Sequence, residues 1–484
     1  MSKDDFLIPR LREIARALGI AVTGRSVDAL ISEIVRATPS PDDLVSYLAI
    51  AVINGAVPNP RRVEALTRRW RLEGLAVLLK TECDRANRNR LIVKKNSSPV
   101  RVSGGVIVDV TDTGRSTFTT GIQRVARETL TRWVGLHEVQ CVSWTQDGRS
   151  LHRVTPLEYE RATLHPAPES LSGEPPVVIP FRATFVLPEI AVDHERALRI
   201  RTIAEFSGSR TVAVGFDTIP VTSAETAGAG MPGAFSKYLA TLARFSSVAT
   251  ISSAAQIEYV GWRSMLPSTG LVGPEIVQVD LPAGIGEVSV ETVERVRHDL
   301  ELDDVNVVLA VGSHEPRKNH LRLLVAAELR WRQGDQFALV MVGGNSWDTS
   351  RFDAMVERLR AAGRPIILLS NASDEVVWSL YRIARFSVFC SLNEGFGLPI
   401  VESLASGTPV VTSDFGSMRE LGEGYGAVLA DPHDAYSMAR AMGELLSGDE
   451  VLERMRREAE NLPLRSWDTY ADRLWLLVDP TTRD

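Results

Sequence analysis

Two acidic residues around a glycine turn form the pattern with the clearest chemical content, in SLNEGFGLPIVESLASGTPVVTSDFGSMREL (391–421). Seven residues separate Glu394 from Glu402. Gly395 and Gly397 would let backbone amides approach a ligand that a Cβ excludes. Pro399 suits the first turn of a helix, whose free N–H groups attract a diphosphate or sugar hydroxyls. Glu402 lies about one helical turn after Pro399. We expect its carboxylate to face the same pocket and to accept hydrogen bonds from ribose hydroxyls. Taken alone, the pattern also fits an ordinary capped helix start.

Two cations lie in a second segment, VGSHEPRKNHLRLL (311–324). A strand, a glycine-containing loop and a helix are predicted here, so Arg317 and Lys318 would stand beside a helix N-terminus. Both features favour diphosphate oxygens, although exposed Arg-Lys pairs are common on surfaces. We expect the flanking His314 and His320 to be surface residues.

An aspartate and a glycine mark two strand ends in the first half of the chain. Asp217 lies in GFDTIPV (215–221), at the carboxyl end of a predicted strand, where reactive groups of α/β sheets belong. Its alternative role is to cap a turn. Gly121 lies in TGIQRV (120–125), where Thr120 and Gln123 have the spacing of a capping box.

No pattern in the sequence predicts a metal site or a bound cofactor. D-x-D, HxxxH and HExxH spacings do not occur, and the three cysteines form no CxxC. A diphosphate would therefore be neutralised by Arg317, Lys318 and helix dipoles, which is a coherent substitute for Mg²⁺.

Short apolar strands alternate with helices in the second half of the chain. Strands are predicted at 305–311, 337–344, 366–370, 386–390 and 409–413, with helices at 374–385 and from Pro399. A further helix follows Lys318, with Leu321, Leu324, Val325 and Leu329 on its apolar face. This alternation indicates a doubly wound parallel sheet, which binds ligands at the carboxyl ends of its strands.

A fainter series of the same kind begins at VIVDV (106–110). A polar loop (111–119) and an amphipathic helix from Thr120 follow, and further strands are predicted at 177–179, 184–187, 211–216 and 248–251. Before residue 95 apolar residues recur at helical spacing, and KKNSSPV (94–100) reads as a linker. The apolar stretch 44–57 is too short for a membrane span, so we expect a buried helix.

The composition is that of a globular protein, with 44% hydrophobic and 24% charged residues among 484. The N-terminus lacks the apolar region of a signal peptide, so we expect a cytoplasmic protein. The net charge of -7 makes nucleic-acid binding unfavourable. Residues 61–101, however, carry twelve Lys/Arg against four Asp/Glu. Residues 1–101 are thus a candidate contact with a partner protein or with anionic lipid at the inner membrane face; the alternative is a solvated helix face.

Residues from about 305 to 478 resemble the catalytic C-terminal domain of family 4 retaining glycosyltransferases (glycosyl transferases group 1) of the GT-B fold. The resemblance is carried by the RKN segment, the E-x7-E element with GFGLP, the following SGTPVVTS, and RSWDTYADRLW (465–475). It implies two Rossmann-like domains with an N-terminal helical extension. We place the extension at 1–95, the acceptor domain at 100–285, the donor domain at 286–465, and a C-terminal helix at 466–484 that packs back on the N-terminal half.

The resemblance also implies roles for individual residues. Arg317 and Lys318 would neutralise the donor diphosphate, Glu394 would contact the donor sugar, and Glu402 would hold the ribose. Asp217 matches the family's HD-x-x-P segment, in which Phe216 replaces the usual His. The remaining donor-binding candidates are Gly121, Gly312, Ser313, Gly343, Gly395, Phe396, Gly397 and Leu398. Gly312 and Ser313 stand where the family's first phosphate-site Arg is usual, so Arg317 is expected to substitute.

The implied activity is metal-independent transfer of a hexose, with retention, from a nucleotide-diphosphate sugar as co-substrate. The acceptor would be a saccharide or a lipid-linked acceptor of bacterial surface polysaccharide, and mannose or rhamnose is our guess for the sugar. Two alternatives are a GT-B nucleotide-sugar epimerase and a catalytically inactive nucleotide-sugar-binding scaffold.

Overall fold

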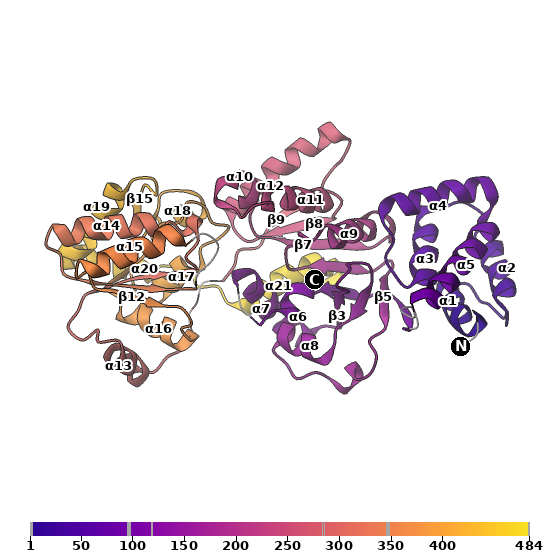
Figure 1. The fold of residues 1–484 in the computed structure, drawn as a ribbon, viewed down its shortest axis with the longest axis horizontal. Helices are drawn as coiled ribbons and strands as arrows, with labels where there is room; N and C mark the ends of the chain where they lie inside the picture. The colour runs from indigo at the N-terminus through magenta and orange to yellow at the C-terminus, as the bar shows by residue number, and fades with distance from the viewer. Residues whose placement is uncertain are drawn as a thin grey trace.

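A computed structural model describes residues 3–93, 98–117, 120–282, 284, 286–344 and 349–482. Three parts follow one another along the long axis of the molecule: the N-terminal helices at one end, a first α/β sheet in the middle, and a second α/β sheet at the other end (Figure 1). The predicted linker 94–100 lies largely outside the described residues, as do residues 118 and 119 of the predicted loop.

The N-terminal part consists of five helices, as the apolar spacing predicted. They are α1 (Lys3–Ala17), α2 (Val27–Ala37), α3 (Asp43–Asn54), α4 (Pro60–Glu73) and α5 (Leu75–Val93). Asp42 caps α3 through the N–H of Leu44, and Gly55, in the left-handed region at φ 62°, ends it. Residues 45–53 are buried all round, so the apolar stretch is the predicted buried helix. The hydroxyl of Tyr47 donates to the carbonyl oxygen of Pro180 at 3.0 Å and joins α3 to the first sheet.

The first sheet has nine strands, in the order β1-β5-β4-β3-β2-β6-β7-β8-β9. The strands are β1 (Val100–Ser103), β2 (Val106–Asp109), β3 (Val139–Trp144), β4 (Leu151–Arg153), β5 (Val177–Pro180), β6 (Thr184–Leu187), β7 (Arg210–Gly215), β8 (Ser247–Thr250) and β9 (Glu275–Gln278). Neighbours pair in parallel except β4, which is antiparallel to β3 and β5. The expectation of a wholly parallel sheet is therefore wrong here, because a short hairpin connects β3 to β4.

Helices connect the strands of this part along the sequence. They are α6 (Thr111–Arg115), α7 (Gly121–Leu136), α8 (Pro156–Thr163), α9 (His194–Phe206), α10 (Ile219–Thr222), α11 (Met231–Leu242) and α12 (Ser253–Met265), with 3₁₀ turns at Glu169–Leu171, Ala224–Thr226 and Leu266–Thr269. The predicted loop 111–119 is wrong in its first half, where the chain turns directly into α6. Thr120 and Gln123 form the predicted capping box at the start of α7.

The second sheet has six strands, all parallel, in the order β12-β11-β10-β13-β14-β15. They are β10 (Val307–Val311), β11 (Ala338–Val342), β12 (Ile366–Leu369), β13 (Phe386–Phe389), β14 (Val410–Ser413) and β15 (Ala427–Ala430). The strand order changes direction between β10 and β13, and such a switch point opens a crevice at the carboxyl ends of the two strands.

The helices from residue 290 onward complete the fold. They are α13 (Val290–Asp299), α14 (His320–Arg332), α15 (Ser350–Ala361), α16 (Asp374–Ile383), α17 (Leu398–Ala405), α18 (Gly416–Gly422), α19 (Ala435–Ser447), α20 (Asp449–Ala459) and α21 (Trp467–Val478), with 3₁₀ turns at Pro316–Lys318 and Pro480–Thr482. The apolar face predicted for α14 is wrong: Leu321 and Val325 are exposed, whereas Leu323, Ala326, Ala327 and Trp331 join Leu324 in the core.

Helix α21 returns from the second sheet to the first and packs on α7 (Figure 1). The ring of Trp475 stacks on His137 at 3.6 Å between centroids, and the indole N–H of Trp133 donates to the carbonyl oxygen of Ala471 at 3.1 Å. These contacts attach α21 to the first α/β part.

Candidate functional site

Arg317 and Lys318 lie against Glu394 at the switch point of the second sheet. The cations follow β10, and Glu394 follows β13, the strand beside it. Oε1 of Glu394 lies 2.7 Å from the Lys318 ammonium, and Oε2 lies 2.7 Å from Nη1 of Arg317. The same guanidinium donates to the carbonyl oxygen of Asn393 at 2.9 Å. The fold thus brings Glu394 against Lys318, which lies 76 positions earlier in the sequence, and against the adjacent Arg317.

These charges change one another's protonation. Burial alone would raise the pKa of Glu394, but Lys318 and Arg317 lower that pKa to about 2. Burial would likewise lower the pKa of Arg317, but Glu394 and Glu315 raise it above its usual value. Glu394 and Arg317 are therefore both ionised at neutral pH. Arg317 also binds Glu315 at 2.6 Å, so the two cations of this segment face two carboxylates. The guanidinium and ammonium groups are hydrogen-bond donors that suit phosphate oxygens.

Asp217 completes the cluster from the first sheet. It follows β7 and closes its own turn by accepting the N–H of Ile219 at 3.1 Å, so its side chain does cap a turn. Burial raises the pKa of Asp217 to about 6, against the opposing effect of Arg317. This second acidic group, near the same guanidinium, titrates close to neutrality.

The glycine loop touches the first sheet directly. A Cβ at position 395 would collide with the carbonyl oxygen of Phe216, so Gly395 is needed for this close approach. The hydroxyl of Ser252 donates to the carbonyl oxygen of Gly395 at 2.6 Å. Glu420 accepts the N–H groups of Ser253 and Ala254 at the start of α12. The two α/β parts therefore meet at the candidate site.

Glu402 lies in a neighbouring cluster, with Arg124 and Tyr381 as its partners. Its Oε1 accepts from Nη1 of Arg124 on α7 at 2.6 Å, and its Oε2 accepts from the hydroxyl of Tyr381 at 3.2 Å. Burial raises the pKa of Glu402, and Arg124 opposes this rise. The guanidinium of Arg124 also lies 5.7 Å from the ring of Trp378. Sequence reasoning missed Arg124 and Tyr381, although Arg124 belongs to the quoted TGIQRV segment.

The other donor-binding candidates lie at the ends of β10 and β11, around the start of α17, and at the start of α7. Gly312 and Gly343 face each other, because a Cβ on Gly343 would collide with the carbonyl oxygen of Gly312, and Ser313 is half-buried beside them. The ring of Phe396 is buried in the core with Ile400, so only its backbone faces the loop. Gly397 is the N-cap of α17 at φ 117°, and Leu398 is the first residue of that helix. Gly121 begins α7 with open space where a Cβ would point.

The expectation for His314 and His320 is wrong, because both are buried. Their Nδ1 atoms lie 3.0 Å apart, and His314 stacks on Phe352 with ring centroids 4.4 Å apart. Burial and, to a smaller extent, the adjacent His314 lower the pKa of His320 to about 3. Two neutral imidazoles therefore share one hydrogen bond beneath the cationic segment and position it.

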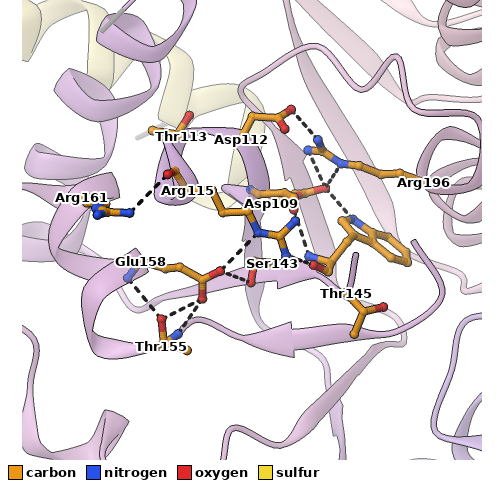
Figure 2. A network of polar contacts seen from close by, with 12 residues as sticks. Asp109, Asp112, Thr113, Arg115, Ser143, Thr145, Thr155, Glu158, Arg161 and Arg196 are labelled. Atoms are coloured by element: carbon orange, nitrogen blue, oxygen red, sulfur yellow. Dashed lines mark hydrogen bonds and ion pairs between the residues drawn. The ribbon is translucent and has the colours of Figure 1, made fainter. Parts of the chain in front are cut away.

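A buried polar network fixes the start of α7, and sequence reasoning did not find it. Figure 2 shows Arg196 between the carboxylates of Asp109 and Asp112. Glu189 binds Arg196 as well and accepts the N–H groups of Asp112 and Thr113, while Asp109 accepts from the indole of Trp144 at 2.7 Å. The network holds α6 at the carboxyl end of β2, and Arg127 of α7 donates to the carbonyl oxygens of Thr113 and Ser116.

Within the described ranges, no group of three or more His, Cys, Asp or Glu is placed to hold a metal ion. No helix of those ranges is long and apolar enough to cross a membrane.

Comparison with known proteins locates the similarity in the second half of the chain. Residues 293–462 match the family model "Glycosyl transferases group 1". The chain is 31% identical to the "Serotype-specific mannosyltransferase WbdA" of Escherichia coli over 169 residues, 34% of this chain and 20% of that protein. It is 35% identical to the "O-antigen chain mannosyltransferase B" of Escherichia coli over 142 residues, 29% of this chain and 37% of that protein. The chain thus spans well under half of the length of these relatives.

A solved structure resembles a larger part of the chain. Anabaena HepE, determined in complex with UDP and glucose, has a TM-score of 0.57 at 13% identity and covers 77% of this chain and 98% of its own. At this identity the likeness concerns the fold alone. It confirms the predicted GT-B arrangement of two Rossmann-like domains, to which this chain adds helices α1–α5.

Proposed function

Residues 293–462 belong to the glycosyl transferases group 1 family, and on that premise we propose that the chain is a retaining, metal-independent glycosyltransferase. It transfers a hexose from a nucleotide-diphosphate sugar to a saccharide or lipid-linked acceptor of a surface polysaccharide. The two Escherichia coli relatives are mannosyltransferases by name, so mannose is the first sugar to test.

The observation that carries this proposal is the contact of both cations with Glu394 at 2.7 Å. Arg317 and Lys318 stabilise the departing diphosphate, whose negative charge grows as the glycosidic bond breaks. Glu394 holds the two cations in place and accepts from hydroxyls of the transferred sugar. The acceptor hydroxyl attacks the face that the diphosphate leaves, and a diphosphate oxygen takes the proton. No protein nucleophile is required.

Glu402 and Asp217 have supporting roles in this proposal. A carboxylate accepts about four hydrogen bonds, so Glu402 retains capacity for ribose hydroxyls beside Arg124 and Tyr381. Asp217 contacts the donor sugar from the first sheet, where Phe216 supplies no imidazole. Backbone groups of Gly395, Gly397 and Leu398 contact sugar or phosphate, and those of Gly312, Ser313, Gly343 and Gly121 line the donor side.

Residues 1–101 are proposed to hold the enzyme against a protein partner or the cytoplasmic membrane face. Arg61, Arg68 and Arg71 are exposed along α4, which supports a contact with an anionic surface. If the full chain did not float with phosphatidylserine vesicles, a contact of residues 1–101 with the membrane face would be excluded.

The test is incubation with GDP-, UDP- and dTDP-hexoses, with and without a saccharide acceptor, followed by analysis of donor and product. We expect an α-linked product from one α-configured donor, with EDTA leaving the rate unchanged. Conversion of the donor to its epimer without acceptor would assign an epimerase instead. Absence of both reactions with every donor, together with tight binding of a nucleoside diphosphate, would assign an inactive scaffold.

A further inference from the structure

A large cavity lies away from the donor cluster, between the N-terminal helices and the edge of the first sheet. Its volume is about 790 Å³, which is within the range of small-molecule sites. Its walls come from α1, α3, α4, α5, α9 and the β3–β4 hairpin. None of the donor-site candidates lines it.

Five arginines line this cavity: Arg10, Arg62, Arg85, Arg149 and Arg199. Among the described lining residues Asp147 is the one acidic side chain. Arg62 binds Glu82, and Arg199 binds Glu195 at 3.0 Å. Arg85 and Arg149 are exposed, and neither has a carboxylate within ion-pair distance in the described ranges. The cavity therefore has a surplus of positive charge.

Two buried donors inside the cavity wall are also unsatisfied. Nε of Arg62 and Nε of Arg199 have no hydrogen-bond partner among the described residues, and Arg199 is only 9% exposed. Burial lowers the pKa of Arg199, and the nearby charge of Arg149 contributes to the same shift. Repulsion between neighbouring guanidinium groups and unpaired buried N–H groups both favour an anion between them.

Hydrogen bonds connect the elements that form the wall of the cavity. The N–H of Val57 donates to the carbonyl oxygen of Arg149 at 3.0 Å, and the hydroxyl of Ser150 donates to that of Gly55 at 2.9 Å. Nη1 of Arg10 donates to the carbonyl oxygen of Ile53 at 2.6 Å. The first two bonds join the α3–α4 loop to the β3–β4 hairpin, and the third joins α1 to α3.

We propose that this cavity binds the phosphate or diphosphate group of a phosphorylated ligand, at a site separate from the donor cluster. Guanidinium groups bind phosphate oxygens in pairs of parallel hydrogen bonds, and five of them around one cavity match a polyanion. Ile50, Val57 and Val177 provide an apolar wall for the remainder of the ligand. The ligand is either a soluble organic phosphate or the headgroup of a lipid. This assignment does not depend on the reaction proposed above.

Calorimetric titration with inorganic pyrophosphate tests the site. All three proteins compared carry Lys318→Ala, so that pyrophosphate binding at the donor cluster is weakened in each of them. Arg85→Ala/Arg149→Ala should weaken pyrophosphate binding at least about ten-fold. The matched control is Arg25→Ala/Arg351→Ala, which removes two exposed arginines outside the cavity and should leave binding unchanged. Equal affinity in all three proteins, or equal loss in both double variants, would overturn the proposal.

Hydrogen exchange locates the ligand without any substitution. Pyrophosphate should slow exchange in wild-type peptides that span residues 55–62 and 145–152, and unchanged exchange there at saturation would contradict the assignment. Flotation with phosphatidylcholine vesicles containing phosphatidic acid identifies the source. Flotation that Arg85→Ala/Arg149→Ala abolishes indicates a lipid headgroup, and pyrophosphate binding without flotation indicates a soluble phosphate.

Discussion

Arg124 on α7 and Glu402 on α17 form an ion pair of 2.6 Å across 278 residues of sequence, and this pair joins the two α/β parts of the molecule. Glu402 is only 5% exposed. A buried carboxylate without its cation is costly, so Arg124 both joins the two parts and opposes the rise in the pKa of Glu402 that burial causes.

Arg124→Ala should therefore lower stability by about 1–3 kcal/mol, seen as a lower Tm in calorimetry. Arg124→Ala/Glu402→Gln should recover part of this loss, because no charge remains buried. Arg132→Ala on the same helix is the control, since its partner Asp468 is 74% exposed and such pairs contribute about 0–1 kcal/mol. An Arg124→Ala variant as stable as Arg132→Ala would show that the pair does not join the two parts.

Asp217 should make stability fall with rising pH over a defined range. Its pKa is about 6 in the folded protein, above the ordinary value of 3.8, so the folded state retains a proton that the unfolded chain has lost. The stabilisation is complete below pH 3.8 and is lost as pH rises through 6. Asp217→Asn should match the wild-type Tm near pH 4 and exceed it by a few degrees at pH 8. A constant difference between the two proteins at every pH would refute this assignment.

The buried histidine pair should make stability fall as pH decreases, which is opposite to the effect expected of Asp217. The pKa of His320, about 3, lies below its ordinary 6.5, so acid protonates the unfolded chain first and stability falls as pH decreases below 6.5. His320→Asn retains a hydrogen-bonding group near His314 without a titrating imidazole. We expect its Tm to decrease less than that of the wild type between pH 7 and pH 4. Parallel Tm curves would exclude protonation of this pair as a cause.

Gly395→Ala tests the contact between the glycine loop and the first sheet. Its methyl group would collide with the carbonyl oxygen of Phe216, so the loop must move and Tm should fall, as for other overpacked sites that cost about 1–3 kcal/mol. Gly121→Ala has open space for the same methyl group and should retain the wild-type Tm. Equal Tm values for both variants would contradict the close approach.

The sequence predicted the second α/β part more completely than the first, for a physical reason. Parallel strands buried on both faces, such as β10 and β11, are continuous apolar runs that are easily recognised. The strands β3 and β4 were missed because the residues of VQCVSW and LHR are apolar only in part. The face of α14 was misassigned because four further small or apolar residues, Leu323, Ala326, Ala327 and Trp331, compete for burial there.

The contacts among the candidate site residues were predicted only in part. Arg317, Lys318 and Glu394 meet as their motifs indicated, because β10 and β13 are neighbours. Arg124 could not be identified as the partner of Glu402, since their contact depends on how α7 and α17 meet. Burial of His314 and His320 likewise depends on packing against Phe352, which lies on α15, beyond α14 and β11 in the sequence.

The central claim is that Lys318 and Arg317 hold the diphosphate of the donor, and calorimetric titration with GDP, UDP and dTDP tests it most directly. We expect wild type to bind one of these nucleotides clearly, and Lys318→Ala to bind it at least about ten-fold more weakly and to turn over about 10²- to 10³-fold more slowly. Lys237→Ala, which removes an exposed lysine of α11, should bind as wild type does. Equal nucleotide affinity in Lys318→Ala and wild type would contradict the account.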